Sequence, residues 1–222
     1  MMEKALIIGN SGGIGAAIEQ ILVTQGCNVT GLSRSGNGLD VTDEKSVATH
    51  LAAEQGGFDL ILVATGALEI NGAVPEKSMK ALSSTAIMDQ MALNAAGPAI
   101  VLKHAMPLLH RNRWSVFAAL SARVGSIGDN RLGGWVSYRA SKAALNQIIR
   151  TASIELARSH PLAICVALHP GTVQTSFTEK YLGRHPSVPA SQAAANLISV
   201  VQGLSPTESG GFYDWSGKQV PW

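Results

Sequence analysis

Short runs of apolar residues alternate with amphipathic helical patterns along the whole chain. Each run is nearly continuous, which is typical of a strand buried on both faces of a sheet. The predicted strands are Ala5–Ile8, Val29–Leu32, Leu60–Val63, Val116–Leu120, Ala163–Leu168 and Phe212–Trp215. Helical spacing predicts helices over Gly13–Gly26, Thr42–Glu54 (with Thr42 as N-cap), Leu82–Leu109, Tyr138–Arg158 and Ser191–Gln202. This alternation predicts an α/β fold, a doubly wound (Rossmann) parallel sheet with helices on both faces.

The composition is that of a folded protein. No linker or internal repeat divides the 222 residues, so we expect one domain over residues 1–222. Hydrophobic residues make up 46% of the chain and charged residues 14%, a balance that excludes an intrinsically disordered protein. The 17 basic and 15 acidic residues leave a net charge of +2 without a basic run. We therefore expect neither nucleic acid nor a membrane as a partner.

The cysteine, histidine and hydropathy patterns exclude further classes of protein. Cys27 and Cys165 each lie in an apolar stretch, which argues against a disulfide scaffold, and the 6 histidines show no metal-ligand spacing. No apolar run approaches the roughly 18 residues that a transmembrane helix needs. The first residues also lack the layout of a signal peptide, so we expect a cytoplasmic protein without a bound metal.

A glycine-rich turn joins the first predicted strand to the first predicted helix. Its glycines, Gly9, Gly13 and Gly15, follow a G-x-x-x-G-x-G spacing that departs from the G-x-G-x-x-G form. Glycine permits a sharp turn and close backbone approach, and the free N–H groups of the helix N-terminus can bind a pyrophosphate. The position directly after a buried strand favours dinucleotide binding over a purely structural turn.

The end of the second predicted strand indicates which dinucleotide is bound. In this fold, the position faces the adenosine ribose, where an acidic residue binds a 2′-hydroxyl and an arginine binds a 2′-phosphate. Arg34 lies there between Ser33 and Ser35, which favours NADP(H) over NAD(H). Asp40 is expected near the adenine edge, although an Asp at this point is equally suited to starting the next helix.

A tyrosine and a lysine lie one helical turn apart. Tyr138 and Lys142 are at i and i+4, on one face of the predicted helix, and Ser121 ends the strand before it. Reduction of a carbonyl needs a hydride and a proton, and a free phenol with a pKa near 10 is a slow acid–base group at neutral pH. A nearby ammonium would lower the pKa of the phenol, and a serine hydroxyl would hold the substrate oxygen.

In this order, these residues closely resemble the short-chain dehydrogenase/reductases. The resemblance covers essentially the whole chain and rests on Gly9, Gly13, Gly15, Asp40, Asn94, Ser121, Tyr138, Lys142 and the run Pro170–Thr175. Segments 121–135 and 137–146 and the terminal Pro221-Trp222 are similar to the C-factor and sniffer carbonyl-reductase branch. The resemblance implies an NADPH-dependent reductase that converts an aldehyde or ketone to an alcohol.

The same resemblance implies roles for individual residues. Tyr138 would be the general acid, Ser121 the donor to the carbonyl oxygen, and Lys142 would hold the ribose and lower the pKa of Tyr138. Asn94 would kink the long helix and hold a water that relays protons to Lys142. The residues expected to contact NADP(H) are Gly9, Ser11, Gly13, Ile14, Gly15, Ser33, Arg34, Asp40, Val41, Ala64, Thr65, Gly66, Tyr138, Lys142, Pro170, Gly171, Val173 and Thr175.

Two features depart from the family pattern. The third strand continues into Ala64-Thr65-Gly66-Ala67, where many members have Asn-Asn-Ala-Gly. Ser121 precedes Tyr138 by 17 residues instead of about a dozen. Ser126 lies 12 residues before Tyr138 and is the competing candidate, but Ser121 is favoured because it ends a strand.

Several questions stay open at the level of the sequence. A redox-sensing or signalling protein of C-factor type with little turnover is the alternative function, and the substrate is not indicated. Glu179–Ser187 is the expected substrate lid, with Phe177 and Tyr181 as apolar contacts. The two long helices are expected to form a homodimer, or a tetramer. Three arginines could meet an acidic substrate, although solvent exposure is favoured for them: Arg123, Arg131 and Arg139. His169 is expected to be structural.

Overall fold

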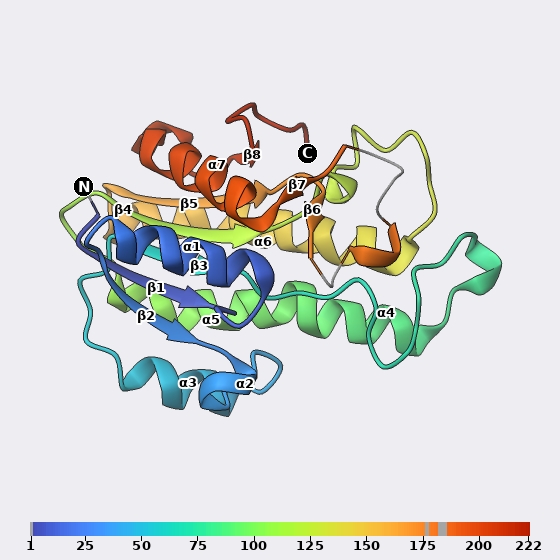
Figure 1. The fold of residues 1–222 in the computed structure, drawn as a ribbon, viewed down its shortest axis with the longest axis horizontal. Helices are drawn as coiled ribbons and strands as arrows, with labels where there is room; N and C mark the ends of the chain where they lie inside the picture. The colour runs from blue at the N-terminus through green and yellow to red at the C-terminus, as the bar shows by residue number, and fades with distance from the viewer. Residues whose placement is uncertain (1, 176–177, 182–185) are drawn as a thin grey trace.

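A six-stranded parallel sheet forms the centre of the protein (Figure 1). The computed structural model describes residues 2–175, 178–181 and 186–222. The strands are β1 (Lys4–Ile8), β2 (Asn28–Leu32), β3 (Leu60–Val63), β4 (Ser115–Leu120), β5 (Ala163–His169) and β8 (Phe212–Asp214). Their order across the sheet is β2-β1-β3-β4-β5-β8, and each neighbouring pair is parallel. A separate pair, β6 (Val173–Gln174) and β7 (Val188–Pro189), follows β5.

Helices cover both faces of the sheet (Figure 1). On one face lie α1 (Gly13–Thr24) and α7 (Ala190–Gly203), whose apolar side chains pack in one hydrophobic cluster. A second cluster unites the other face with α3 (Glu44–Ala52), α5 (Gly97–Ala105) and α6 (Val136–Ser159). The predicted doubly wound Rossmann-like fold is therefore confirmed. Short elements complete the description: α2 (Arg34–Asn37), α4 (Ser84–Met91) and 3-10 turns at Met79–Ala81, Met106–Leu108, Arg123–Gly125, Glu179–Tyr181 and Pro206–Glu208.

The predicted strands agree with the observed ones to within one residue at each end. The long helical pattern predicted over Leu82–Leu109 is divided in the structure, and the π-helical turn that contains Asn94 agrees with the kink that the family resemblance implied there. That stretch consists of α4, a π-helical turn at Ala92–Ala96, α5 and a 3-10 turn. Pro98 explains the break, because its ring nitrogen cannot donate to the carbonyl of Asn94, four residues earlier.

The start of α3 also differs from the prediction. Asp43, not Thr42, is the N-cap, and its carboxylate accepts from the Lys45 amide at 3.0 Å. The Thr42 hydroxyl instead donates to Asp40 at 2.6 Å. A carboxylate is the stronger acceptor for the free amides of a helix start, so it takes the cap.

The strand order places a crevice at the carboxyl ends of β1 and β3. The chain leaves β1 toward β2 on one side and returns to β3 on the other, so the connections diverge at this point. Ligands of open α/β sheets bind where the connections diverge in this way. The Gly9–Gly15 turn and the Ala64–Ala67 segment follow these two strands.

Candidate active site

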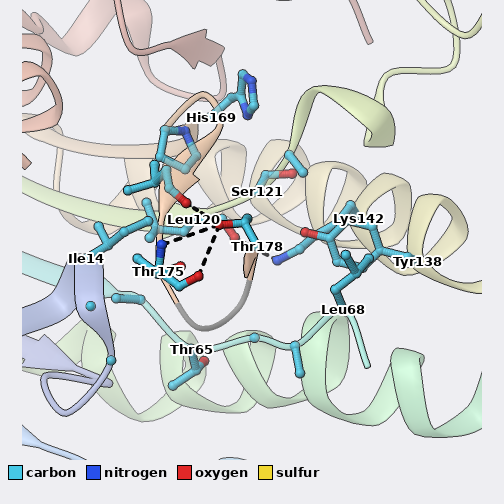
Figure 2. A pocket seen from close by; sticks show the side chains of 18 of the residues that line it. Ile14, Thr65, Leu68, Leu120, Ser121, Tyr138, Lys142, His169, Thr175 and Thr178 are labelled. Carbon is cyan, nitrogen blue, oxygen red and sulfur yellow. Dashed lines mark hydrogen bonds between the residues drawn. The ribbon is translucent and has the colours of Figure 1, made fainter. Parts of the chain in front are cut away.

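The main cavity lies at this carboxyl edge and has a volume of about 440 Å³. Such a size is typical of small-molecule and cofactor sites. Figure 2 shows Ile14 and Thr175 at one end of the cavity and Ser121, Tyr138 and Lys142 at the other. The lining residues are Gly12, Gly13, Ile14, Ala64, Thr65, Gly66, Ala67, Leu68, Glu69, Leu120, Ser121, Ala122, Tyr138, Lys142, His169, Pro170, Gly171, Val173, Thr175, Thr178 and Lys180.

The predicted site residues fall into two groups around this cavity. Twelve of them line it: Gly13, Ile14, Ala64, Thr65, Gly66, Ser121, Tyr138, Lys142, Pro170, Gly171, Val173 and Thr175. The others lie behind its wall or beyond it, within the part of the chain that the structure describes: Gly9, Ser11, Gly15, Ser33, Arg34, Asp40, Val41 and Asn94. Phe177, the expected apolar contact of the lid, lies outside the described residues.

The glycine turn has no room for side chains at its key positions. A Cβ on Gly15 would lie 2.3 Å from the carbonyl oxygen of Gly9, and Gly9 itself has a φ of +93°. A Cβ on Gly13 would lie 2.6 Å from the methyl group of Thr175. The turn therefore brings backbone directly to the cavity wall, where the first amides of α1 begin.

Tyr138 and Lys142 are both buried on α6, one turn apart. The Lys142 Nζ donates to the carbonyl oxygen of Leu120 at 2.8 Å and lies 5.9 Å from the centroid of the Tyr138 ring. Burial lowers the pKa of the Lys142 ammonium to about 7 and raises the pKa of the Tyr138 phenol above its usual range. The raised pKa of Tyr138 is opposite to the lowered one expected from the sequence, because the low-dielectric surroundings disfavour a phenolate.

The two candidate serines have different surroundings. Ser121, at the end of β4, lines the cavity, and its Oγ donates to the Asn146 Oδ1 at 2.6 Å. The Ser126 hydroxyl instead donates to the carbonyl oxygen of Pro221 and accepts from the Asp129 amide at 3.1 Å. Of the two, Ser121 is the one that lies beside Tyr138 and Lys142.

Asn94 is fully buried behind the cavity wall, at the middle of the π-helical turn. Its carboxamide accepts from the amide of Ala67 at 3.1 Å and donates to the carbonyl oxygen of the same residue at 2.9 Å. It also donates to the Gln90 Oε1, and Gln90 in turn donates to the carbonyl of Leu68 at 3.0 Å. A Cβ on Gly66 would lie 2.7 Å from the Asn94 Oδ1 and 3.5 Å from the Lys142 Nζ. Asn94 thus supports the segment after β3, next to Lys142.

The residues predicted near the adenosine lie after β2. Ser33 is buried and its Oγ accepts from the Gly36 amide at 3.1 Å, whereas Arg34 is exposed. The Asp40 carboxylate accepts from the amide and the hydroxyl of Thr42 at 2.9 and 2.6 Å. The hydrogen bond from the Thr42 hydroxyl is the main cause that lowers the pKa of Asp40. These contacts agree with the alternative interpretation of Asp40, in which it organises the entry to α3.

Two buried polar atoms of lining residues have no hydrogen-bond partner among the residues that the structure describes. They are the Thr65 Oγ1 and the His169 Nδ1. Burial, with the nearby Arg123 cation, lowers the pKa of His169 to about 4, so its ring is neutral at pH 7. Unpartnered buried donors and acceptors are uncommon in folded proteins, and these two border the cavity, where a bound polar group could reach them. No cluster suited to holding a metal ion occurs among residues 2–175, 178–181 and 186–222.

Trp135 is the N-cap residue of α6 and has a left-handed backbone conformation with a φ of 52°. Its amide donates to the carbonyl oxygen of Glu76 at 2.6 Å. Its ring meets those of Tyr138 and Tyr181 edge-on, at centroid distances of 6.3 and 5.4 Å. The buried Glu76 carboxylate also accepts from the Ser137 amide at 3.2 Å, so the 70–82 segment holds the start of α6 in place.

Several site residues were missed by sequence reasoning. Asn146 continues the spacing of Tyr138 and Lys142 by another four residues, so the same helical-face argument could have found it. Gln90 likewise precedes Asn94 by four residues. Glu69 and Lys180 meet at 2.7 Å across 111 residues, and no local pattern indicates that contact.

Comparisons with known proteins agree with this geometry. Residues 38–184 match the family model for short chain dehydrogenases. The chain is 30% identical, over 100% of both chains, to 1-hydroxy-2-glutathionyl-2-methyl-3-butene dehydrogenase of Rhodococcus sp. (strain AD45). It is 37% identical to the C-signal protein of Myxococcus xanthus over 59% of this chain and 75% of that one.

Solved structures share the fold at lower sequence identity. A short-chain dehydrogenase/reductase from Burkholderia multivorans with bound NADP has a TM-score of 0.84 at 24% identity over 100% of both chains. An NADPH-bound carbonyl reductase from chicken fatty liver has a TM-score of 0.84 at 24% identity, over 99% of each chain. The carbonyl reductase Sniffer of D. melanogaster has a TM-score of 0.80 at 19% identity, over 100% of both chains.

Proposed function

The chain belongs to the short-chain dehydrogenase family of oxidoreductases, and on that premise we propose that it is an NADPH-dependent carbonyl reductase. One observation carries the proposal. Ser121, Tyr138 and Lys142 line one end of a cavity whose other end is the glycine turn. A proton donor, an oxygen-binding hydroxyl and a backbone cradle for a diphosphate therefore share one enclosure, as the reduction of an aldehyde or ketone requires.

The residues around the cavity fit a nicotinamide dinucleotide. Gly13 and Ile14 would hold the diphosphate at the start of α1, with the Thr175 hydroxyl beside it. The unpartnered Thr65 Oγ1 and the Lys142 ammonium would hold ribose hydroxyls. The backbone of Val173 would meet the carboxamide. When bound, NADPH supplies the hydride that reduces the carbonyl carbon.

The protein's own groups would then handle the oxygen and the proton. Ser121 would donate its hydroxyl hydrogen to the substrate oxygen, for which it must release the Asn146 Oδ1. Tyr138 would give the proton to the developing alkoxide. Its raised pKa suits this direction, because the phenol stays protonated until an alkoxide of still higher basicity forms. Lys142 would stabilise the phenolate that is left, and Asn94 would steady the wall beside Lys142.

The cofactor preference rests on Arg34. Its exposed guanidinium follows β2, where it can pair with a 2′-phosphate, and no acidic side chain occupies the adjacent positions Ser33 and Ser35. The NADP-bound and NADPH-bound relatives of the same fold support the choice over NAD(H). Arg34→Gln should raise the KM for NADPH about tenfold or more and leave the KM for NADH unchanged. An equal change for both cofactors would contradict this assignment.

Assembly into a homodimer, or a tetramer, is part of the proposal. Large apolar side chains are exposed on the two helices expected to pair, Met88 of α4 at 64% and Ile154 of α6 at 51%. Light scattering at micromolar concentration should give at least twice the chain mass. A monomer would contradict the dimer without affecting the proposed reaction.

The decisive experiment measures NADPH oxidation with a panel of aldehydes and ketones. The wild type should turn over, and Tyr138→Phe should lose about a hundredfold or more of kcat while still binding NADPH. The identity to the C-signal protein favours one alternative, a nucleotide-binding signalling protein with little turnover. That alternative would hold if the wild type bound NADPH yet oxidised it no faster than Tyr138→Phe.

A further inference from the structure

Two opposite charges face each other at the cavity. Glu69 comes six residues after β3 and Lys180 lies on the 3-10 turn Glu179–Tyr181; both line the cavity. The Lys180 Nζ donates to the Glu69 Oε2 at 2.7 Å, and the Tyr181 hydroxyl donates to the Glu69 Oε1 at 2.9 Å. Both oxygens of the carboxylate are thus engaged, each by a different residue of the same turn.

The two partners are held to different degrees. The Glu69 side chain is 26% exposed, whereas the Lys180 side chain is 71% exposed. The hydrogen bonds from Lys180 and then Tyr181 lower the pKa of Glu69, so its carboxylate is ionised at neutral pH. The more buried Glu69 is the fixed member of the pair, and Lys180 is the member that solvent can reach.

Two of the arginines near this wall have partners outside the cavity lining. Among the described residues that line the cavity there is no arginine. The guanidinium of Arg139 donates to the carbonyls of Gly134, Val124 and Gly133 at 2.9, 3.2 and 3.1 Å. Arg123 pairs with Asp129 at 2.5 Å. These two guanidinium groups are therefore engaged outside the cavity lining.

The remaining titratable lining groups lie beside the reacting centre. The Lys142 Nζ is bonded to the carbonyl of Leu120, and His169 is neutral at pH 7. Among the described lining residues beyond the reacting centre, a charged substituent on a substrate would meet the charges of Glu69 and Lys180, which already neutralise each other. An anionic substituent must displace Glu69 from Lys180, and a cationic one must displace Lys180 from Glu69. An uncharged substituent displaces neither.

We propose that the Glu69–Lys180 pair makes this enzyme selective for uncharged carbonyl substrates, with Glu69 as the specificity-determining residue. This inference rests on the carbonyl-reductase function proposed above. It has a direct consequence for variants: once one partner loses its charge, the charge that is left should attract substrates of opposite sign. Glu69→Gln should therefore favour anionic aldehydes, and Lys180→Met should favour cationic ones.

Three aldehydes with the same ring test the proposal. They are benzaldehyde, 4-carboxybenzaldehyde and 4-(trimethylammonio)benzaldehyde, assayed for kcat/KM with saturating NADPH at one pH and ionic strength. Each value is divided by the wild-type value for the same aldehyde, which cancels the intrinsic reactivity of the ring. We expect Glu69→Gln to raise the ratio for the carboxylate about tenfold over that for benzaldehyde, and Lys180→Met to do the same for the ammonium.

Glu179→Gln is the matched control, because it removes an exposed negative charge from the same turn without touching the cavity lining. Its three ratios should stay equal. The proposal is overturned if Glu69→Gln and Lys180→Met change all three aldehydes by the same factor, since the pair would then only hold the turn in place. It is also overturned if Glu179→Gln reproduces the shift.

A binding measurement separates this inference from the proposed reaction. Calorimetry on the NADPH-loaded protein with benzoate and benzamide needs no turnover. Glu69→Gln should strengthen benzoate binding about tenfold relative to benzamide. Charge-dependent binding without reduction of any aldehyde would contradict the proposed function alone. Equal effects on benzoate and benzamide would contradict the charge selection alone.

Discussion

The two ends of the cavity are built by different means. At the glycine turn the wall is backbone, and its shape depends on the absence of side chains at Gly13 and Gly15. At the catalytic end the wall is a set of buried polar side chains, of which Ser121 and Lys142 are held by hydrogen bonds to Asn146 and to the carbonyl of Leu120. One end is defined by steric exclusion and the other by paired donors and acceptors.

This difference predicts how each end responds to change. At the glycine turn, a single added methyl group should have a large effect, since it must displace backbone atoms. At the catalytic end, the loss of one hydrogen bond should have a smaller effect on stability, because each bond contributes only about 1 kcal/mol net. Mutations at the glycine turn should thus act on folding and cofactor binding together, and mutations at the catalytic end should act mainly on kcat.

The largest effect is expected at the catalytic end itself. Ser121→Ala should lower kcat about a hundredfold to a thousandfold, as the loss of one donor to a developing oxyanion does, with little change in the KM for NADPH. Ser126→Ala is the control and should keep kcat within about twofold while lowering the Tm, because it loses its bonds to Pro221 and Asp129. Loss of activity in Ser126→Ala with full activity in Ser121→Ala would reverse the assignment.

The glycine turn should show the next largest effect, on stability. In Gly15→Ala the new Cβ would lie 2.3 Å from a backbone oxygen, which should cost about 2–3 kcal/mol of unfolding free energy. Thermal unfolding should show a Tm lower by about 5–10 °C. Gly12→Ala is the matched variant: its Cβ would lie 3.4 Å from the same oxygen, and its Tm should change little. Equal Tm shifts in Gly15→Ala and Gly12→Ala would contradict the steric explanation of the glycine turn.

A pH dependence should distinguish the catalytic end from the turn. The pKa of Lys142 is about 7 in the folded protein and 10.5 when unperturbed, so the unfolded chain binds more protons between these values. Stability should therefore rise with pH across that window, by about 1 kcal/mol for each pH unit, and gain nothing from this group below pH 7. Tm scans from pH 6 to pH 9 should show the rise, and Lys142→Met should lack it. A parallel rise in both proteins would assign it to other groups.

The smallest effect is expected from the hydrogen bond that positions the Ser121 hydroxyl, and it should appear in kcat. Asn146→Ala removes the acceptor of Ser121 and should lower kcat about fivefold to tenfold, leaving the KM for NADPH unchanged. Gln147→Ala, in the adjacent exposed position of α6, should change neither. A loss as large as that of Ser121→Ala would mean that Asn146 does more than position the serine.

The sheet could be predicted because its information is local. Six apolar runs become six strands, since a strand covered on both faces needs apolar residues at nearly every position. The break at Asn94 was not predicted by periodicity, which continues through it. The family resemblance implied a kink at Asn94, and Pro98 supplies its physical cause, because a proline nitrogen cannot donate to a carbonyl four residues earlier. The cap of α3 was misplaced by one residue because Thr42 and Asp43 both suit that role.

The site residues show the same difference between what local sequence determines and what depends on tertiary packing. Residues that follow strands or share a helical face were found, because the fold itself brings Tyr138, Lys142 and the end of β4 together. Lys180 lies in the expected lid segment, but its contact with Glu69 was not predicted, since that contact depends on how two irregular segments pack. The direction of the pKa shift of Tyr138 also needed coordinates, because burial is a property of the whole fold.

Trp135 gives this protein an optical reporter without any label. Its indole ring stands edge-on between Tyr138 and Tyr181, beside the cavity, and is one of 4 tryptophans in the chain. A ligand that displaces either tyrosine changes the surroundings of a fluorophore, so its arrival can be followed by emission in stopped-flow. Trp135→Phe identifies which part of the signal comes from this position, and occupancy can then be timed separately from chemistry.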